Sequence, residues 1–580
     1  MLFTTPDGKS PDQKLLRAQA FRAMARMLVA HEFSSEDPWC FVHFNLENFK
    51  GFNEKFGHSA GDELLEFIGS AIQACFPGQP LTRSSADHFE LVTPYSTVIP
   101  GVKRVRSLFR SRIKDSSIWL KAGYYLPERA DEDINIIADR AKQANDAIKG
   151  RRDRYYREYD EELRQQIATR QFVLDNFDDA LANGHIKAYY QPIVHVASGR
   201  VCDEEALSRW EDPERGIIYP NEFIPVLEDA RLIHMLDLNI VRQACRDIKR
   251  LQAHEGLTEI PPISVNLSRL DFELCDIVSE IEEILAQQGI PHKALSIEIT
   301  ESALTGNSEF LKGEIDRFRN DGFEVWMDDF GSGYSSLNLL KEYKFDLVKI
   351  DMEFLKDFDA VPETRVLVAS VINLLKELGF KTLVEGVEGK EQYEFLRALG
   401  CGRAQGYLLG HPESMDSMLE RLDAGSYPPI ETAGGRSFYS LVAHVNLMRP
   451  TPTKGPNGEF IASDYPVATA MRRKGTWTYL NATDVYHDFL AQIGAKTLEE
   501  SAARMNDPTR VEYMRINEAL EQALASRDWE WTTYFESGKY CTMRIKVIAE
   551  DRARDMVAVL LLASSLQESK LINPTGFFLQ

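Results

Sequence analysis

Acidic and amide side chains recur at one kind of position in the middle of this chain, after a short apolar run and before a segment with helical periodicity. These groups are Glu205-Ala206-Leu207, Val265-Asn266, Glu298-Ile299-Thr300-Glu301, Asp328-Asp329, Lys349-Ile350-Asp351 and Glu385-Gly386-Val387-Glu388. Charged residues at the ends of successive buried strands are typical of an active site at one mouth of a barrel. So many carboxylates cannot converge without a counter-charge, so the pattern indicates a metal-dependent site.

The candidate ligands are all carboxylate or amide oxygens, with no cysteine or histidine among them. Hard oxygen ligands favour Mg²⁺ or Mn²⁺ over Zn²⁺. Two such ions about 4 Å apart would clamp a phosphodiester and the attacking water. Because Asp328 and Asp329 are adjacent, both can serve one site only if the strand is kinked there.

Two cations could complete this chemistry. Lys349 could orient the nucleophilic water or stabilise charge on the phosphate. Arg209, four residues after Glu205, could hold a phosphate oxygen with its fork of donors. The chain as a whole has a net charge of −22, which argues against binding of nucleic-acid polymers. An anionic ligand would therefore depend on local cations or bound metal.

The elements that must position these groups alternate along the chain. Residues 263–266 and 295–299 alternate as strands do, and helical patterns cover Val366 to Leu378 and Glu391 to Leu399. A strand-then-helix order repeated over roughly 250 residues is typical of a (β/α)₈ barrel, with its chemistry at the carboxyl ends of the strands. The sequence therefore predicts an α/β fold built on a (β/α)₈-type barrel.

Taken in order, these motifs resemble the EAL family of cyclic di-GMP phosphodiesterases over roughly Tyr189 to Pro412. The resemblance opens at Tyr190-Gln191-Pro192-Ile193-Val194 and closes at Gln405-Gly406-Tyr407-Leu408-Leu409. It implies metal-dependent hydrolysis of cyclic di-GMP to linear pGpG, or more distantly of another short dinucleotide. The alternative is a receptor that binds cyclic di-GMP without cleaving it and acts through protein partners. Such domains normally lack an acidic ligand, and none is missing here.

The resemblance also assigns roles. The implied metal ligands are Glu205, Asn266, Glu298, Asp328, Asp329 and Glu385. Lys349 would activate the water, with Glu205, Asp329 and Glu385 as the other catalytic groups. Substrate contacts would come from Gln191, Leu207, Arg209 and Gln405. Glu301 would steady the loop after Asp329, where Ser332 stands in place of the usual threonine. A homodimer is implied as well.

The first part of the chain resembles a GGDEF diguanylate cyclase domain whose signature is broken. Ser85-Ala86-Asp87-His88-Phe89 stands where Gly-Gly-Asp-Glu-Phe would be, so two glycines of a tight hairpin are lost. His88 replaces the catalytic acid, and Asn45 replaces a Mg²⁺-holding aspartate. Phe76 to Gln79 occupies the place of the inhibitory Arg-x-x-Asp site. We therefore expect this domain to make no cyclic di-GMP.

Asn53 and Asp62 nevertheless match the guanine-reading pair of that family. One hypothesis is that the domain binds GTP and thereby raises phosphodiesterase activity. The alternative, which the damaged phosphate and metal sites favour, is a folded scaffold or a dimerisation surface.

The C-terminal region shows helices followed by three strands and is similar in layout only to a PAS-like sensor fold. The expected strands are Thr476 to Leu480, Trp529 to Phe535, Tyr540 to Ala549 and Met556 to Ala563, and the helices are Thr497 to Ala503 and Val511 to Ala525. We expect Trp477, Trp529 and Trp531 in the core rather than around a ligand. The region is interpreted as a small α+β sensor-like or dimerisation domain.

At 580 residues the chain is too long for one core. The predicted divisions are a degenerate GGDEF-like domain at 15–149, a helical connector at 150–170, an EAL domain at 171–423 and a C-terminal domain at 438–566. Thr451 to Glu459 is expected to form an exposed loop. Seven scattered cysteines, no signal peptide and no membrane-length apolar run predict a cytoplasmic protein.

Overall fold

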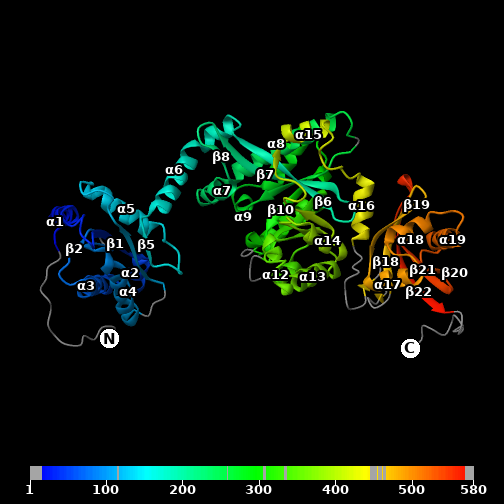
Figure 1. The fold of residues 1–580 in the computed structure, drawn as a ribbon. Coiled ribbons are helices and arrows are strands. Elements are labelled where there is room, and N and C mark those ends of the chain that lie inside the picture. The colour runs from blue at the N-terminus through cyan, green and yellow to red at the C-terminus, as the bar shows by residue number, and fades with distance from the viewer. Residues whose placement is uncertain are drawn as a thin grey trace. The chain divides into compact units, whose positions relative to one another are not determined.

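The computed structural model describes residues 16–85, 87–113, 117–257, 259–304, 308–331, 336–443, 453–454, 460–461 and 466–567 (Figure 1). The chain divides into two compact units, Met1–Phe172 and Val173–Gln580, and each is described by itself. Within the described ranges, every helix is too short or too polar to cross a membrane.

The first unit is a five-stranded sheet with helices on both faces. The strand order is β2-β3-β1-β4-β5, with β1 central and antiparallel to both of its neighbours. The strands are β1 (Trp39–Glu47), β2 (Leu81–Arg83), β3 (His88–Pro94), β4 (Trp119–Tyr125) and β5 (Tyr156–Glu158). The helices are α1 (Ala18–His31), α2 (Phe49–Phe56), α3 (His58–Cys75), α4 (Tyr95–Arg112) and α5 (Ile134–Asp146). Alternate residues of β1 pack into two separate apolar clusters, one on each face of the sheet.

The prediction of a helical connector at 150–170 is wrong in its first half. Residues 156–158 form β5, which pairs in parallel with β4 at the edge of the first sheet. The helix α6 (Glu161–Ala182) begins only afterwards and continues past the expected boundary at 170. The charges of mixed sign in this segment predicted a solvated helix. Tyr155 and Tyr156 instead pack against the core of the first unit, and the chain there forms a strand.

The second unit begins with a closed eight-stranded barrel. The strands follow one another as β6-β14-β13-β12-β11-β10-β9-β7, and β7 pairs with β6 to close the ring. They are β6 (Ile186–His195), β7 (Arg200–Asp212), β9 (Ile263–Leu267), β10 (Leu295–Thr300), β11 (Glu324–Phe330), β12 (Leu347–Ile350), β13 (Lys381–Val384) and β14 (Arg403–Gln405). Seven of them run parallel from β7 to β14. The predicted α/β barrel is therefore confirmed.

One strand departs from a regular (β/α)₈ barrel. β6 runs antiparallel to both β7 and β14. The turn between β6 and β7 spans only residues 196–199, which is too short for the crossover that parallel strands need. Gln191 therefore reaches the mouth of the barrel from β6, a strand that runs opposite to the other seven.

Helices surround the barrel between the later strands. They include α8 (Ile233–Ala253), α10 (Ile277–Gln288), α11 (Ser308–Asp321), α13 (Pro362–Glu377) and α14 (Lys390–Ala398). The helical patterns at Val366 to Leu378 and Glu391 to Leu399 correspond to α13 and α14 and are confirmed. Inside the barrel, an apolar layer around Trp326 lies beside the buried ion pair of Arg403 and Asp203, whose charged atoms are 2.9 Å apart.

The C-terminal domain has an antiparallel sheet of five strands in the order β19-β18-β22-β21-β20. The strands are β18 (Val467–Arg473), β19 (Thr476–Ala482), β20 (Glu530–Glu536), β21 (Lys539–Asp551) and β22 (Met556–Gln567), with α17 (Asp484–Gln492), α18 (Leu498–Met505) and α19 (Val511–Ser526) inserted after β19. This order agrees with the predicted PAS-like layout. Trp477 is buried as expected, whereas Trp531 is 57% exposed. The loop expected at Thr451 to Glu459 lies mostly outside the described residues.

Candidate active site

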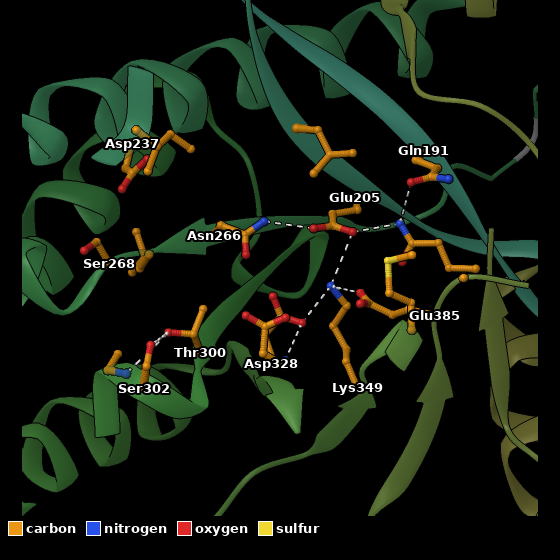
Figure 2. Close-up of a pocket in the computed structure, with 18 of the residues that line it drawn as sticks. Gln191, Glu205, Asp237, Asn266, Ser268, Thr300, Ser302, Asp328, Lys349 and Glu385 are labelled. Atoms are coloured by element: carbon orange, nitrogen blue, oxygen red, sulfur yellow. Dashed lines mark hydrogen bonds and ion pairs between the residues drawn. The ribbon is translucent and has the colours of Figure 1, made fainter. Parts of the chain in front are cut away.

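The carboxyl ends of the parallel barrel strands surround a cavity of about 600 Å³. Figure 2 shows Glu205 on β7, Asp328 on β11 and Glu385 just after β13 pointing toward the ammonium group of Lys349. The expected site residues that line the cavity are Gln191, Glu205, Leu207, Asn266, Asp328, Asp329, Lys349, Glu385 and Gln405. The barrel therefore brings together side chains that are up to 214 positions apart in the sequence.

Lys349 is the charge centre of the site. Its Nζ lies 2.6 Å from Glu298, 2.7 Å from Glu385, 3.1 Å from Asp328 and 3.3 Å from Glu205. Burial by itself would lower the pKa of this lysine, but the surrounding carboxylates hold its pKa well above the ordinary value. The side chain therefore stays protonated and can act as a donor.

One ammonium cannot balance four carboxylates, and the acids respond differently. Burial opposes ionisation of Glu205, yet Lys349 and the amide of Gln405 hold its pKa below the usual value. Burial and the charge of Glu205 raise the pKa of Glu298 well above its ordinary value. Burial also raises the pKa of Glu385, to about 8, despite its contact with Lys349. The cluster therefore holds protons that a divalent cation would displace.

Two amides fix the carboxylate of Glu205. Asn266 Nδ2 donates to one oxygen at 2.9 Å, and Gln405 Nε2 donates to the other at 2.7 Å. Gln405 also donates to Gln191 Oε1 at 3.1 Å, and Gln191 in turn donates to the carbonyl of Gly410 at 3.0 Å. These bonds connect β6, β7, β9 and β14, so the orientation of Glu205 depends on four strands.

The strand β11 is kinked where two adjacent acids end it. The pairing of β11 with β12 shifts between Met327 and Phe330, and Asp329 has a φ of +56°. A positive φ is costly for a residue with a Cβ and marks local strain. The kink lets both Asp328 and Asp329 line the cavity, as the sequence predicted. Burial, Asp328 and Asp351 raise the pKa of Asp329 to about 6.

The donor set fits divalent cations that prefer oxygen. Carboxylate oxygens of Asp328, Asp329 and Glu385 all lie within 4.8 Å of one another. Glu298 keeps one carboxylate oxygen buried without a hydrogen-bond partner among the described residues, so it retains a lone pair for a cation. Oxygen-only ligation of this kind is typical of Mg²⁺ or Mn²⁺.

The loop after Asp329 is anchored by the residue expected to do so. Glu301 is buried, and its Oε2 accepts a hydrogen bond of 2.9 Å from the backbone N–H of Gly331. Gly331 has a φ of +100°, and a Cβ there would lie 2.1 Å from the ring of Phe354, so glycine is required. This contact supports the loop-stabilising role. Ser332, further along the same loop, lies outside the described residues.

Two parts of the chain match known protein families. Residues 174–412 match the family described as EAL domain, and residues 16–152 match the family described as diguanylate cyclase, GGDEF domain. The chain carries a GGDEF domain followed by an EAL domain.

Relatives share both domains in part. The chain is 31% identical over 402 residues to an uncharacterized signaling protein of Caulobacter vibrioides, covering 66% of this chain and 48% of that one. It is 29% identical over 381 residues to the cyclic di-GMP phosphodiesterase PdeR of Escherichia coli, covering 64% and 57%. A solved structure of PaMucR phosphodiesterase with c-di-GMP is 32% identical, covering 42% and 98%, with a TM-score of 0.40. The chain spans about half the length of the curated relatives it matches.

Arg209 is the expected substrate contact that does not line the cavity of the EAL domain. Its Nη1 donates to the carbonyl of Ser208 at 2.8 Å, and its guanidinium lies 5.9 Å from the ring centre of Tyr189 and 5.8 Å from that of Tyr219. The guanidinium therefore lies near two aromatic rings and outside the residues that line the cavity.

Sequence reasoning missed a second acidic pair in the EAL domain. Asp237 on α8 lines the cavity away from Lys349 (Figure 2). Burial and the neighbouring Asp271 raise its pKa well above the usual value, and burial raises the pKa of Asp271 to about 6. At least one of the two carries a proton at neutral pH. A charged residue between Leu236 and Leu238, on the buried side of a helix, was the available signal.

The GGDEF domain has imidazoles where its signature acid is expected. His88 Nδ1 and His43 Nε2 are 3.0 Å apart and share a hydrogen bond. Burial and the neighbouring His88 lower the pKa of His43 to about 3, so its ring is neutral. Asn45 faces His88 across the strand pair. Ala86, in the altered signature, lies outside the described residues.

The two candidate GTP-binding residues come from adjacent helices of the same domain. Asn53 is on α2, and Asp62 is exposed on α3. Gly61, next to Asp62, packs so closely on Asn53 that a Cβ would lie 1.9 Å from its amide oxygen. The two segments are therefore brought together, while Asn53 Oδ1 is buried without a hydrogen-bond partner among the described residues.

Proposed function

We propose that the EAL domain hydrolyses cyclic di-GMP to linear pGpG with the help of Mg²⁺ or Mn²⁺. The residues that would hold the ions are Glu205, Asn266, Glu298, Asp328, Asp329 and Glu385. The observation that carries the proposal is the convergence of four carboxylates on one buried lysine in a cavity of about 600 Å³. That volume suits a ligand of this size. The relative named cyclic di-GMP phosphodiesterase supports the choice of substrate.

Hydrolysis adds one water to one phosphodiester. The water oxygen bonds to phosphorus, the bond between phosphorus and the 3′-oxygen breaks, and the 3′-oxygen takes up a proton. Bound divalent ions supply Lewis-acid polarisation of the phosphate and activation of the water. Because the pKa of Lys349 is raised, this residue orients the water or stabilises phosphate charge by donating, rather than acting as a base.

Around this centre, other side chains would hold the dinucleotide. Leu207 offers an apolar contact beside Glu205, and Gln191 and Gln405 form the polar side of the cavity. Arg209, near two tyrosine rings, is the proposed phosphate contact. Together these groups would give one apolar contact and three polar ones to a ligand with anionic phosphates and planar bases.

The proposed role of the GGDEF domain is that of a scaffold or dimerisation surface that makes no cyclic di-GMP, within a homodimer. His43, His88 and Asn45 offer no carboxylate, so none of them supplies the negative charge that holds a nucleotide-bound Mg²⁺. GTP binding at Asn53 and Asp62, with activation of the EAL domain, is the competing proposal, and a GTP titration of turnover separates the two.

The deciding experiment incubates the purified full chain with cyclic di-GMP and Mg²⁺ or Mn²⁺ and separates the products by chromatography. We expect pGpG to form, and chelator or Ca²⁺ to suppress it. Tight binding of cyclic di-GMP with no pGpG under any of these conditions would replace the enzyme by a receptor.

A further inference from the structure

A strap of chain that follows the barrel, residues 427–431, is attached to the first residues of β7, the strand that carries Glu205. The backbone N–H of Val201 donates to the carbonyl of Pro429 at 3.0 Å, and the N–H of Glu431 donates to the carbonyl of Val201 at 2.7 Å. Val201 and Ile430 form a parallel bridge. The strap therefore adds a short piece of sheet to the start of β7.

The strap makes a second contact through a side chain. The hydroxyl of Tyr427 donates to Oε1 of Glu204, and both side chains are buried. The other oxygen of Glu204 has no hydrogen-bond partner among the described residues. Tyr427 is therefore the side chain that keeps this buried carboxyl from being unpaired. Loss of such a partner leaves the full cost of desolvation uncompensated.

These two attachments flank a β-bulge in β7. Ile193 pairs with Asp203 and Val194 pairs with Val201, so Cys202 is the extra residue of the bulge. Two positions further on, the backbone N–H of Glu204 donates to the carbonyl of Pro262 at 2.9 Å, on the side of β9. Between the bulge and Glu205, the backbone is therefore held by β9, and the Glu204 side chain is held by the strap.

Glu205 follows Glu204 directly, and its side chain makes polar contacts with three other residues of the site. Its two oxygens meet Asn266 and Gln405 at 2.9 Å and 2.7 Å while lying 3.3 Å from Lys349. Because side chains alternate along a strand, Glu204 points away from the cavity and can be held from outside without blocking it. A small rotation of β7 at the bulge would move Glu205 relative to the other ligands.

We propose that Tyr427, through its hydrogen bond to Glu204, is a positioning residue that holds Glu205 in register for metal binding. The inference rests on the proposed function. The strap continues into α16 (Ala433–Val442), whose Phe438, Tyr439 and Val442 pack on the sheet of the C-terminal domain. Tyr427 therefore lies on the segment of chain that connects that sheet to β7.

The test compares full-length variants by calorimetric titration with Mn²⁺ in the absence of substrate. Tyr427→Phe removes only the hydroxyl, and we expect it to weaken Mn²⁺ binding by about fivefold, the effect of one net hydrogen bond. Tyr393→Phe is the matched control, because Tyr393 is partly buried and donates to the carbonyl of Val196 at 3.0 Å, in the turn before β7, and not to Glu204. The control should lower the thermal midpoint but leave Mn²⁺ affinity within about twofold.

A second variant separates positioning from stability. Glu204→Met combined with Tyr427→Phe removes both partners, so no carboxyl is left unpaired and the thermal midpoint should recover. Mn²⁺ binding should stay weak, because the attachment is still missing. Wild-type Mn²⁺ affinity in both Tyr427 variants would overturn the inference. Wild-type protein that binds Mn²⁺ but makes no pGpG would overturn the proposed function instead, and the titration would still decide the role of Tyr427.

Discussion

Replacing Lys349 by methionine would leave the acidic cluster of the EAL domain without its only close cation among the described residues. Methionine keeps the length of the side chain but not its charge. Lys349 is 1% exposed, so water cannot take over its role. Removing one partner from a buried ionic cluster costs about 3–5 kcal/mol. For a domain of this size, that corresponds to a fall in thermal midpoint of about 6–20 °C.

The pH dependence of this loss has a definite sign. Both glutamates have an ordinary pKa of 4.5. In the folded protein, the pKa of Glu298 is raised well above that value, and the pKa of Glu385 is raised to about 8. Between those values the folded state binds more protons than the unfolded state. The stability that these groups contribute is therefore complete below about pH 4.5 and is lost as the pH rises through about 8. Without the ammonium of Lys349, the carboxylates lose their counter-charge and this decline becomes steeper.

The assay is thermal unfolding of wild type and Lys349→Met in chelator at pH 5.5, 7 and 8.5, followed by the same scans with Mn²⁺. We expect the two proteins to differ little at pH 5.5 and most at pH 8.5. Mn²⁺ should narrow the difference, because it supplies the missing positive charge. Turnover should fall at least about a hundredfold, as for loss of a positioned proton donor. Equal midpoints at pH 8.5 in chelator would refute the charge balance argued from the structure.

Three further changes test separate parts of the molecule. Glu205→Ala should abolish pGpG formation while circular dichroism stays unchanged, since it removes a ligand at the cavity; substantial residual turnover would mean that the metal site is misassigned. GTP at concentrations up to millimolar should not change the turnover of either wild type or Asn53→Ala. Activation of wild type alone would favour the regulatory alternative. Arg403→Met should destabilise the EAL domain by about 3–5 kcal/mol in denaturant titrations, because Asp203 stays buried without its partner; an unchanged midpoint would contradict this.

The convergence of these acidic side chains on one site could be predicted because an ionisable group within a buried strand carries two signals at once. Glu298 has an ionisable side chain, yet it lies between Ile297 and Ile299, which are both buried. A charge at such a place is too costly unless it has a function or a partner. The kink at Asp328 and Asp329 could be predicted by the same reasoning, since two adjacent side chains cannot both face one cavity from a regular strand.

Features that depend on partners distant in sequence could not be predicted in this way. The antiparallel direction of β6 follows from pairing on both of its sides, which alternation within one strand does not report. The ion pair of Arg403 with Asp203 joins two strands whose paired residues are 200 positions apart in the sequence. In the sequence, each of these residues looks like an ordinary charged residue near the end of a strand, so the pairing is not visible. In the connector, β5 exists because β4 offers a free edge to it. These are tertiary effects that override the local pattern.

The two acidic clusters of the cavity explain why one end favours cations and the other does not. At the Lys349 end, the carboxylates come from separate strands and share one ammonium, and one oxygen of Glu298 has no donor among the described residues. At the Asp237 end, burial raises the pKa of both acids, which favours their neutral forms. A cyclic dinucleotide has charged phosphates in its ring and neutral bases outside it. For the proposed substrate, we therefore expect a phosphate to lie toward the Lys349 end and a base toward the Asp237 end.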